Sequence, residues 1–115
     1  MDPTKQDGEQ AIINFSGEKV GLGPHCRALM PIYQKRVNDF EVTRTLDIGF
    51  RPATLEAEEA WYERLCRSDN EVAFAIYEPQ TLRPIGSTGL HRIDHKARTA
   101  EYGILIGLKD CWGKG

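Results

Sequence analysis

The pattern of hydrophobic and polar positions predicts one short strand, two helices and then three strands. Residues 18–22 alternate between polar or small and apolar side chains and end at a Gly-Pro pair, as a strand entering a turn does. Apolar side chains recur at helical spacing in residues 29–37, where Pro31 either marks a helix start near Met30 or kinks a longer helix. Residues 40–52 show no period, which predicts a loop of the kind that often carries binding functions.

The second helix is predicted to start after Thr54, whose hydroxyl can accept a hydrogen bond from a free N–H of the first turn. Glutamates occupy its first turns and arginines its last turn, which is the arrangement that the helix dipole favours. Polar residues 68–70 end it. Its predicted apolar stripe consists of Ala57, Ala60, Trp61 and Leu65.

The rest of the chain has the pattern of an antiparallel meander. Residues 72–77 are apolar on both faces of an extended chain, as expected of a strand that is covered on both sides. Two further strands, at residues 85–93 and 99–108, are separated by a polar reversal at 94–98. The predicted fold class is therefore α/β (α+β), with a mostly antiparallel sheet and two helices after the first strand.

Length and composition limit the chain to one small domain. With 115 residues, a flexible tail at 1–17 and a domain at 18–115 are expected, and residues 11–15 either add a short strand or lie on the surface. Fifteen basic and seventeen acidic side chains give a net charge of -2, which argues against a nucleic-acid partner. The longest apolar run falls far short of a membrane span and the first residues lack a secretory signal, so a cytoplasmic protein without a membrane partner is expected. The three widely spaced cysteines support neither a disulfide framework nor a metal site.

Glycines after the last predicted strand can turn backbone N–H groups toward an anion. Gly113 and Gly115 flank Lys114 in such an arrangement. Five residues separate Gly107 from Gly113 where a nucleotide-binding P-loop has four, and no Ser or Thr follows Lys114, so that motif is excluded. Taken alone, these residues fit a phosphate cradle or a flexible glycine tail.

Several separated segments together resemble a GNAT-type N-acetyltransferase. They are residues 85–94 (IGSTGLHRID), 100–107 (AEYGILIG) and 112–115 (WGKG). Residues 37–44 (VNDFEVTR) are similar to the Asn-Asp-x-Glu-Val segment of the branch that holds ribosomal-protein N-terminal and spermidine acetyltransferases. The resemblance runs from about Glu18 to the end of the sequence. It implies the N-terminal portion of a GNAT fold that ends inside the pyrophosphate loop.

The resemblance implies acetyl-CoA as co-substrate. The strand that offers backbone groups to the pantetheine arm matches Ile104, Leu105 and Ile106. The loop that holds the pyrophosphate matches Trp112, Gly113, Lys114 and Gly115. Because the helix behind that loop lies beyond these residues, the chain alone is expected to bind acetyl-CoA poorly and to be inactive.

Two side chains are candidates for acid–base catalysis, because an amine must lose a proton before it attacks a thioester. The resemblance places Glu101 near the acetyl group, and a solvated or ion-paired glutamate is the alternative. His91, on the preceding strand, is the second candidate base, with a hydrogen-bonded surface histidine as its alternative. Trp61 and Tyr62 match the helix that lines the acceptor site, although Trp61 also fits the core.

The functional prediction is acetyl transfer from acetyl-CoA to a primary amine, which is a small molecule or a protein N-terminus. The alternative is a non-catalytic binding or interaction module derived from an acetyltransferase. An open edge on the last strand and an apolar sheet face are compatible with self-association into a homo-oligomer.

Overall fold

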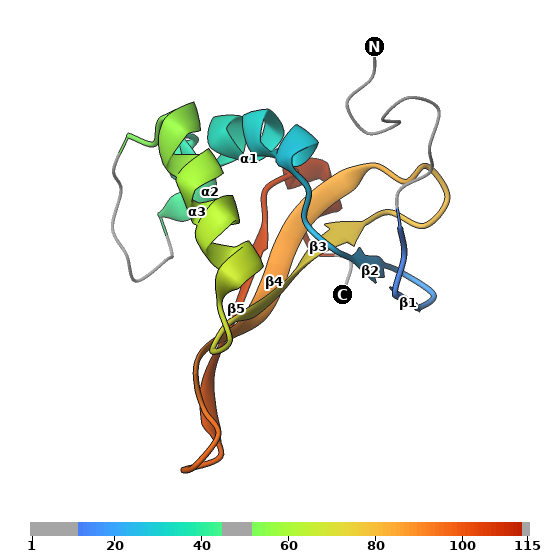
Figure 1. Cartoon of the computed structure of the whole chain (residues 1–115). Helices are drawn as coiled ribbons and strands as arrows, with labels where there is room; N and C mark the ends of the chain where they lie inside the picture. Colours follow the sequence, from blue (N-terminus) through green and yellow to red (C-terminus); the bar gives the residue numbers. More distant parts are fainter. Residues whose placement is uncertain (1–11, 45–51, 114–115) are drawn as a thin grey trace.

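The computed structural model describes residues 12–44 and 52–113, which form one antiparallel sheet with helices on one side (Figure 1). In chain order and in sheet order the strands are β1 (Phe15–Ser16), β2 (Gly21–Gly23), β3 (Val72–Tyr77), β4 (Pro84–Asp94) and β5 (Thr99–Ile106). The helices are α1 (Met30–Val37), α2 (Phe40–Thr43) and α3 (Leu55–Arg67), with 3-10 turns η1 (Arg27–Leu29) before α1 and η2 (Lys109–Cys111) after β5. The predicted fold class is confirmed.

The two longer helices begin where local chemistry allows. Pro31 lies in the first turn of α1, where a missing N–H breaks no helical hydrogen bond, so the predicted start near Met30 is confirmed. The Thr54 hydroxyl accepts a 3.1 Å hydrogen bond from the N–H of Ala57, which confirms the predicted cap of α3. The helix ends at Arg67, directly before the predicted polar stop.

Short elements are the main departure from the prediction. Residues 40–43 form helix α2 rather than a loop, because the Asp39 carboxylate accepts a 3.0 Å hydrogen bond from the N–H of Glu41 and so caps a single turn. One turn is too short to show a helical period. Strand β1 pairs with β2 at the end of the segment 11–15, for which the sequence allowed either a short strand or a surface position. The remainder of the predicted loop, residues 45–51, lies outside the described residues.

The core lies between α1 and the sheet. Leu29, Met30 and Tyr33 pack against Ala75 and Tyr77 of β3, and all five are buried. Helix α3 covers this layer with half-buried side chains, and the predicted stripe is wrong at two positions. The two alanines are exposed, whereas Leu55, Trp61 and Tyr62 pack against the core and Leu65 is half-buried.

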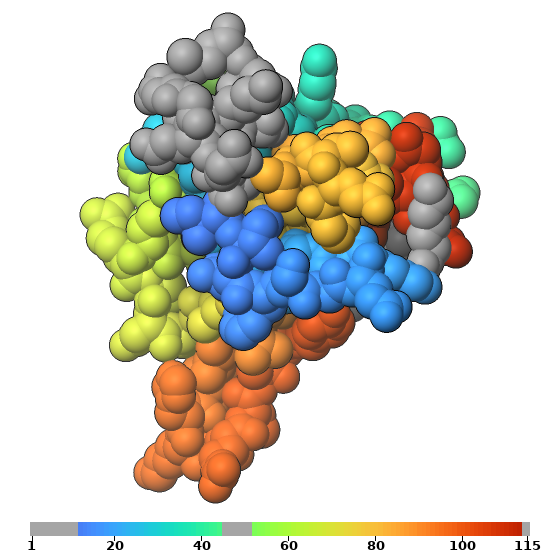
Figure 2. All heavy atoms as spheres, turned by 90° about the vertical axis from the view of Figure 1, so that its right-hand side faces the viewer, coloured from blue at the N-terminus to red at the C-terminus, as the bar shows by residue number. Residues whose placement is uncertain are grey.

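The opposite face of the sheet carries exposed apolar side chains. Val72, Leu90 and Tyr102 lie opposite one another on β3, β4 and β5, and they are 46%, 42% and 68% exposed. The prediction that β3 is covered on both sides therefore holds only for its second half, where residues 75–77 are buried. Figure 2 shows the β4–β5 hairpin, in orange, projecting away from the rest of the molecule.

Candidate active site

Strand β5 forms one edge of the described sheet. The N–H of Gly107 donates to the Ile85 carbonyl at 2.9 Å, which fixes the phase of the β4–β5 ladder. Backbone groups alternate in direction along an antiparallel strand, so those of Leu105 point to β4 and those of Ile104 and Ile106 point to the open edge. Two of the three residues predicted to bind cofactor, Ile104 and Ile106, therefore have backbone groups that no strand of the described sheet pairs with.

The predicted pyrophosphate loop folds back onto the end of this edge. The indole Nε1 of Trp112 donates to the Ile106 carbonyl at 2.6 Å. Gly113 follows with φ of 77°, a left-handed conformation that glycine adopts without strain, and a Cβ there would meet no atom of the non-adjacent described residues within 4 Å. The Trp112 indole thus lies against the end of the β5 edge, whereas Lys114 and Gly115 lie outside the described residues. A role of residues 112–115 in binding the pyrophosphate stays a prediction.

Ion pairs attach the segment after β5 to the rest of the domain. Lys109 Nζ lies 2.9 Å from Asp39 Oδ2 and 3.0 Å from Glu41 Oε1. The hydrogen bond from Lys109 lowers the pKa of Asp39, and the hydrogen bond to Asp39 raises the pKa of Lys109. Arg83 pairs in the same way with Asp110, at 3.5 Å. The sequence pattern gave no sign of these contacts, because they join residues far apart in the chain.

The two candidate bases occupy facing positions on neighbouring strands. His91 on β4 lies directly opposite Glu101 on β5. His91 Nδ1 lies 3.0 Å from Glu71 Oε2, and Glu101 Oε1 lies 3.1 Å from the Arg92 guanidinium. A Cβ at Gly103 would lie 3.0 Å from His91 Nε2, so the glycine leaves room for the imidazole.

The chemistry available at this pair follows from its exposure and partners. The side chains of His91 and Glu101 are 42% and 57% exposed, so solvent and a substrate can reach both. The contact with the Glu71 carboxylate orients the imidazole of His91 through Nδ1, and Nε2 lies on the side of Gly103. Glu101 lies three residues from Ile104, about 10 Å along an extended strand, a separation that a bridging water and part of a substrate can span. No sequence pattern marked Glu71 and Arg92 as partners of these side chains, because the pairs depend on the register of the strands.

Trp61 and Tyr62 are engaged in packing. The Trp61 ring meets the buried His25 imidazole edge to face at 5.1 Å, while the Arg27 guanidinium lies 5.4 Å from the centre of the Tyr62 ring. His25 Nε2 lies 3.0 Å from Ser87 Oγ. Burial lowers the pKa of His25 to about 4, with the backbone of Phe74 opposing the shift. An acceptor-binding role of Trp61 and Tyr62 stays a prediction.

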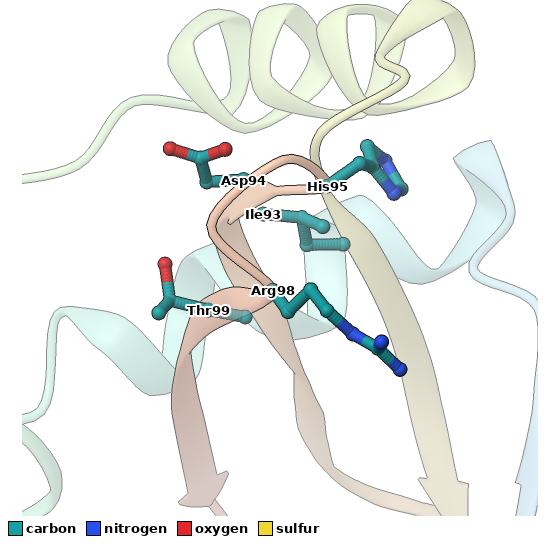
Figure 3. A pocket seen from close by; sticks show the side chains of 6 residues that line it. Ile93, Asp94, His95, Arg98 and Thr99 are labelled. Atoms are coloured by element: carbon teal, nitrogen blue, oxygen red, sulfur yellow. The ribbon is translucent and has the colours of Figure 1, made fainter.

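A hollow at the tip of the β4–β5 hairpin is lined by Ile93, Asp94, His95, Arg98, Thr99 and Ala100 (Figure 3). The labelled polar side chains diverge in Figure 3, with Asp94 and Thr99 on one side and His95 and Arg98 on the other. Nothing there converges on a ligand. Among residues 12–44 and 52–113 no three His, Cys, Asp or Glu side chains gather as metal ligands, and no helix has the length and apolar character of a membrane span.

Comparisons with known proteins identify the family. Residues 22–115 match the family model described as an acetyltransferase (GNAT) domain. The chain therefore belongs to the GNAT acetyltransferase family, as its motifs predicted. No curated protein matches the chain.

Solved structures share the fold. The spermidine N-acetyltransferase from Vibrio cholerae in complex with CoA and spermine superposes with a TM-score of 0.75 at 19% identity, over 86% of this chain and 57% of that one. A domain from Methanocaldococcus jannaschii DSM 2661 gives a TM-score of 0.68 at 20% identity, over 84% of this chain and 60% of that one. The chain thus spans less than two thirds of the length of either structure.

Proposed function

We propose that the protein transfers an acetyl group from acetyl-CoA to a primary amine. The observation that carries the proposal is the open edge of β5, where the backbone groups of Ile104 and Ile106 point outward beside Trp112 and Gly113. Membership of the GNAT family supports acetyl-CoA as co-substrate. The CoA and spermine bound to the Vibrio cholerae enzyme support the same co-substrate and an amine acceptor.

In the proposed reaction, the pantetheine arm lies along the edge of β5, in the place that a further strand of the sheet would occupy. The outward N–H groups of Ile104 and Ile106 supply hydrogen bonds to it and to the oxyanion that develops on the thioester carbonyl. Glu101 removes a proton from the ammonium group, directly or through water, with His91 as the second base. The amine nitrogen then bonds to the carbonyl carbon while the C–S bond breaks. CoA leaves as the thiolate and takes up, directly or through water, the proton that the nitrogen loses as the neutral amide forms.

The acceptor in this proposal is a small-molecule amine or a protein N-terminus, and the reaction takes place in the cytoplasm. The exposed apolar side chains of Val72, Leu90, Tyr102 and Ile104 favour the second candidate, a non-catalytic interaction module, since such a surface suits a macromolecular partner or a second copy. The inactivity of residues 1–115 by themselves stays a prediction.

Thiol release from acetyl-CoA in the presence of polyamines, small amines and peptides tests the proposal. The assay uses the whole protein, with residues 1–115 measured beside it. Glu101→Gln is expected to lower kcat by about a hundredfold while binding of acetyl-CoA is retained. Glu63→Gln is the matched control, because the Glu63 side chain is 51% exposed, against 57% for Glu101, and pairs with Arg27 at the same 3.1 Å distance. Absence of amine-dependent thiol release, with binding intact, favours the interaction module.

A further inference from the structure

The Asn-Asp-x-Glu segment at residues 38–41 has a structural role that its sequence does not reveal. Asn38 closes the base of the connection between α1 and α3. Its Nδ2 donates to the Ala53 carbonyl at 2.8 Å, and its Oδ1 accepts from the Ala53 N–H at 2.8 Å. Gln34 donates to the same carbonyl at 3.0 Å. Hydrogen bonds between Asn38 and Ala53 therefore hold the end of α1 against the residues before α3. Residues 39–41 follow directly after this point in the chain.

The two acidic residues of the segment face the loop that follows β5. Asp39 uses one carboxylate oxygen to cap α2 and the other to bind Lys109 at 2.9 Å. Glu41 binds the same ammonium group at 3.0 Å. Two carboxylates thus share one lysine that lies 68 residues beyond Glu41 in the chain.

The same loop has two further attachments. Gly107 packs directly on the side chain of Arg36, where a Cβ would lie 2.7 Å from Arg36 Cδ, and Arg36 donates to the Pro84 carbonyl at 2.6 Å. Asp110 pairs with Arg83. Residues 107–110 are therefore fixed to α1, to the α2 cap and to the β3–β4 turn immediately before Trp112 and Gly113.

We propose that Asp39 and Glu41, acting through Lys109, position residues 107–113 for the diphosphate of acetyl-CoA. The inference rests on the proposed function, because that function assigns the diphosphate to this loop. A loop ordered before binding loses less conformational entropy when the ligand arrives, so the clamp of Asp39, Glu41 and Lys109 strengthens binding without touching the ligand. The two carboxylates neutralise the Lys109 charge, which makes Lys109 a positioning residue rather than a phosphate ligand.

Kinetics with two acetyl donors test this role in the whole protein. Lys109→Met is expected to raise KM for acetyl-CoA about fivefold with kcat nearly unchanged, and to leave KM for S-acetylpantetheine, which lacks the diphosphate, close to the wild-type value. The double variant Asp39→Asn/Glu41→Gln is expected to have the same effect. Lys35→Met, at an exposed lysine of α1, is the matched control.

The double variant separates the two roles of Lys109. If Lys109 contacted the diphosphate directly, removal of its two carboxylate partners would free its charge and lower KM for acetyl-CoA, an outcome that overturns the proposal. Unchanged KM in all variants overturns it as well. If the wild-type protein releases no thiol, the proposed function fails instead.

Hydrogen exchange without any cofactor tests the clamp independently of activity. Lys109→Met and the double variant are expected to speed amide exchange of residues 107–113 severalfold while residues 72–77 of β3 keep their wild-type rates. Exchange at 107–113 that stays at the wild-type rate overturns the proposal whatever the enzymatic result.

Discussion

The buried His25 makes the stability of the domain depend on pH. Its imidazole makes edge-to-face contacts with the rings of Tyr33 and Trp61, and the residue is only 7% exposed. Burial lowers its pKa from 6.5 to about 4, and the backbone of Phe74 offsets only part of that shift. Between these two pH values the unfolded chain binds a proton that the folded chain does not. The free energy of unfolding therefore falls as the pH drops from 6.5 toward 4.

The pKa of His25 sets the size of this effect. The shift from 6.5 to about 4 corresponds to about 3 kcal/mol of unfolding free energy, of which about 2 kcal/mol is lost by about pH 5. The free energy of unfolding of a small domain is about 5–15 kcal/mol in total, so a loss of this size is readily measured. At about pH 5 most carboxylates are still ionised, so His25 dominates the change.

Urea denaturation at about pH 7.5 and about pH 5 measures the effect. His25→Gln keeps a hydrogen-bonding group near Ser87 and removes the titrating imidazole. Its free energy of unfolding is therefore expected to fall by about 2 kcal/mol less than that of wild type between the two pH values. His95→Gln, at an exposed position in the hairpin tip, is the control and is expected to follow wild type. Equal pH dependence in wild type and His25→Gln would refute the argument.

Two further predictions concern the layer between α1 and the β4–β5 pair. Tyr33→Phe removes a buried 2.7 Å hydrogen bond to the Gly86 carbonyl and is expected to cost about 1–2 kcal/mol in urea denaturation; wild-type stability would show that water replaces the hydroxyl. Gly86→Ala places a methyl group against the Leu105 carbonyl oxygen and is expected to force β4 and β5 apart, lowering Tm by several degrees. A wild-type Tm would contradict the close approach of these strands.

The longer elements were predictable because each carries a strong local signal. Thr54 and Pro31 mark helix starts through their own hydrogen-bonding chemistry, and residues 72–77 are apolar on both faces. Helix α2 had no such signal, since one turn shows no period and the Asp39 cap resembles any loop aspartate. The glycine-containing motifs identified the family although sequence identity to the solved structures above is about 20%.

The candidate site was predictable in its residues but not in its geometry. A regular ladder from Asp94 opposite Thr99 would place Arg92 opposite Glu101. The structure has a bulge, with Arg92 at φ 51°, which shifts the register by one and brings His91 opposite Glu101 instead. An arginine in a left-handed conformation carries no sequence signature. The contacts of Lys109 were equally hidden, because they depend on how distant segments pack.

Backbone amide protection on addition of acetyl-CoA tests the central claim most directly, namely that the open edge of β5 binds the co-substrate. The whole protein is compared with and without acetyl-CoA by NMR-detected hydrogen exchange. New protection is expected at the amides of Ile104 and Ile106, with little change at Gly103 and Leu105, which already bond to β4. Protection confined to the hairpin tip at 93–100, or no protection on β5, would contradict it.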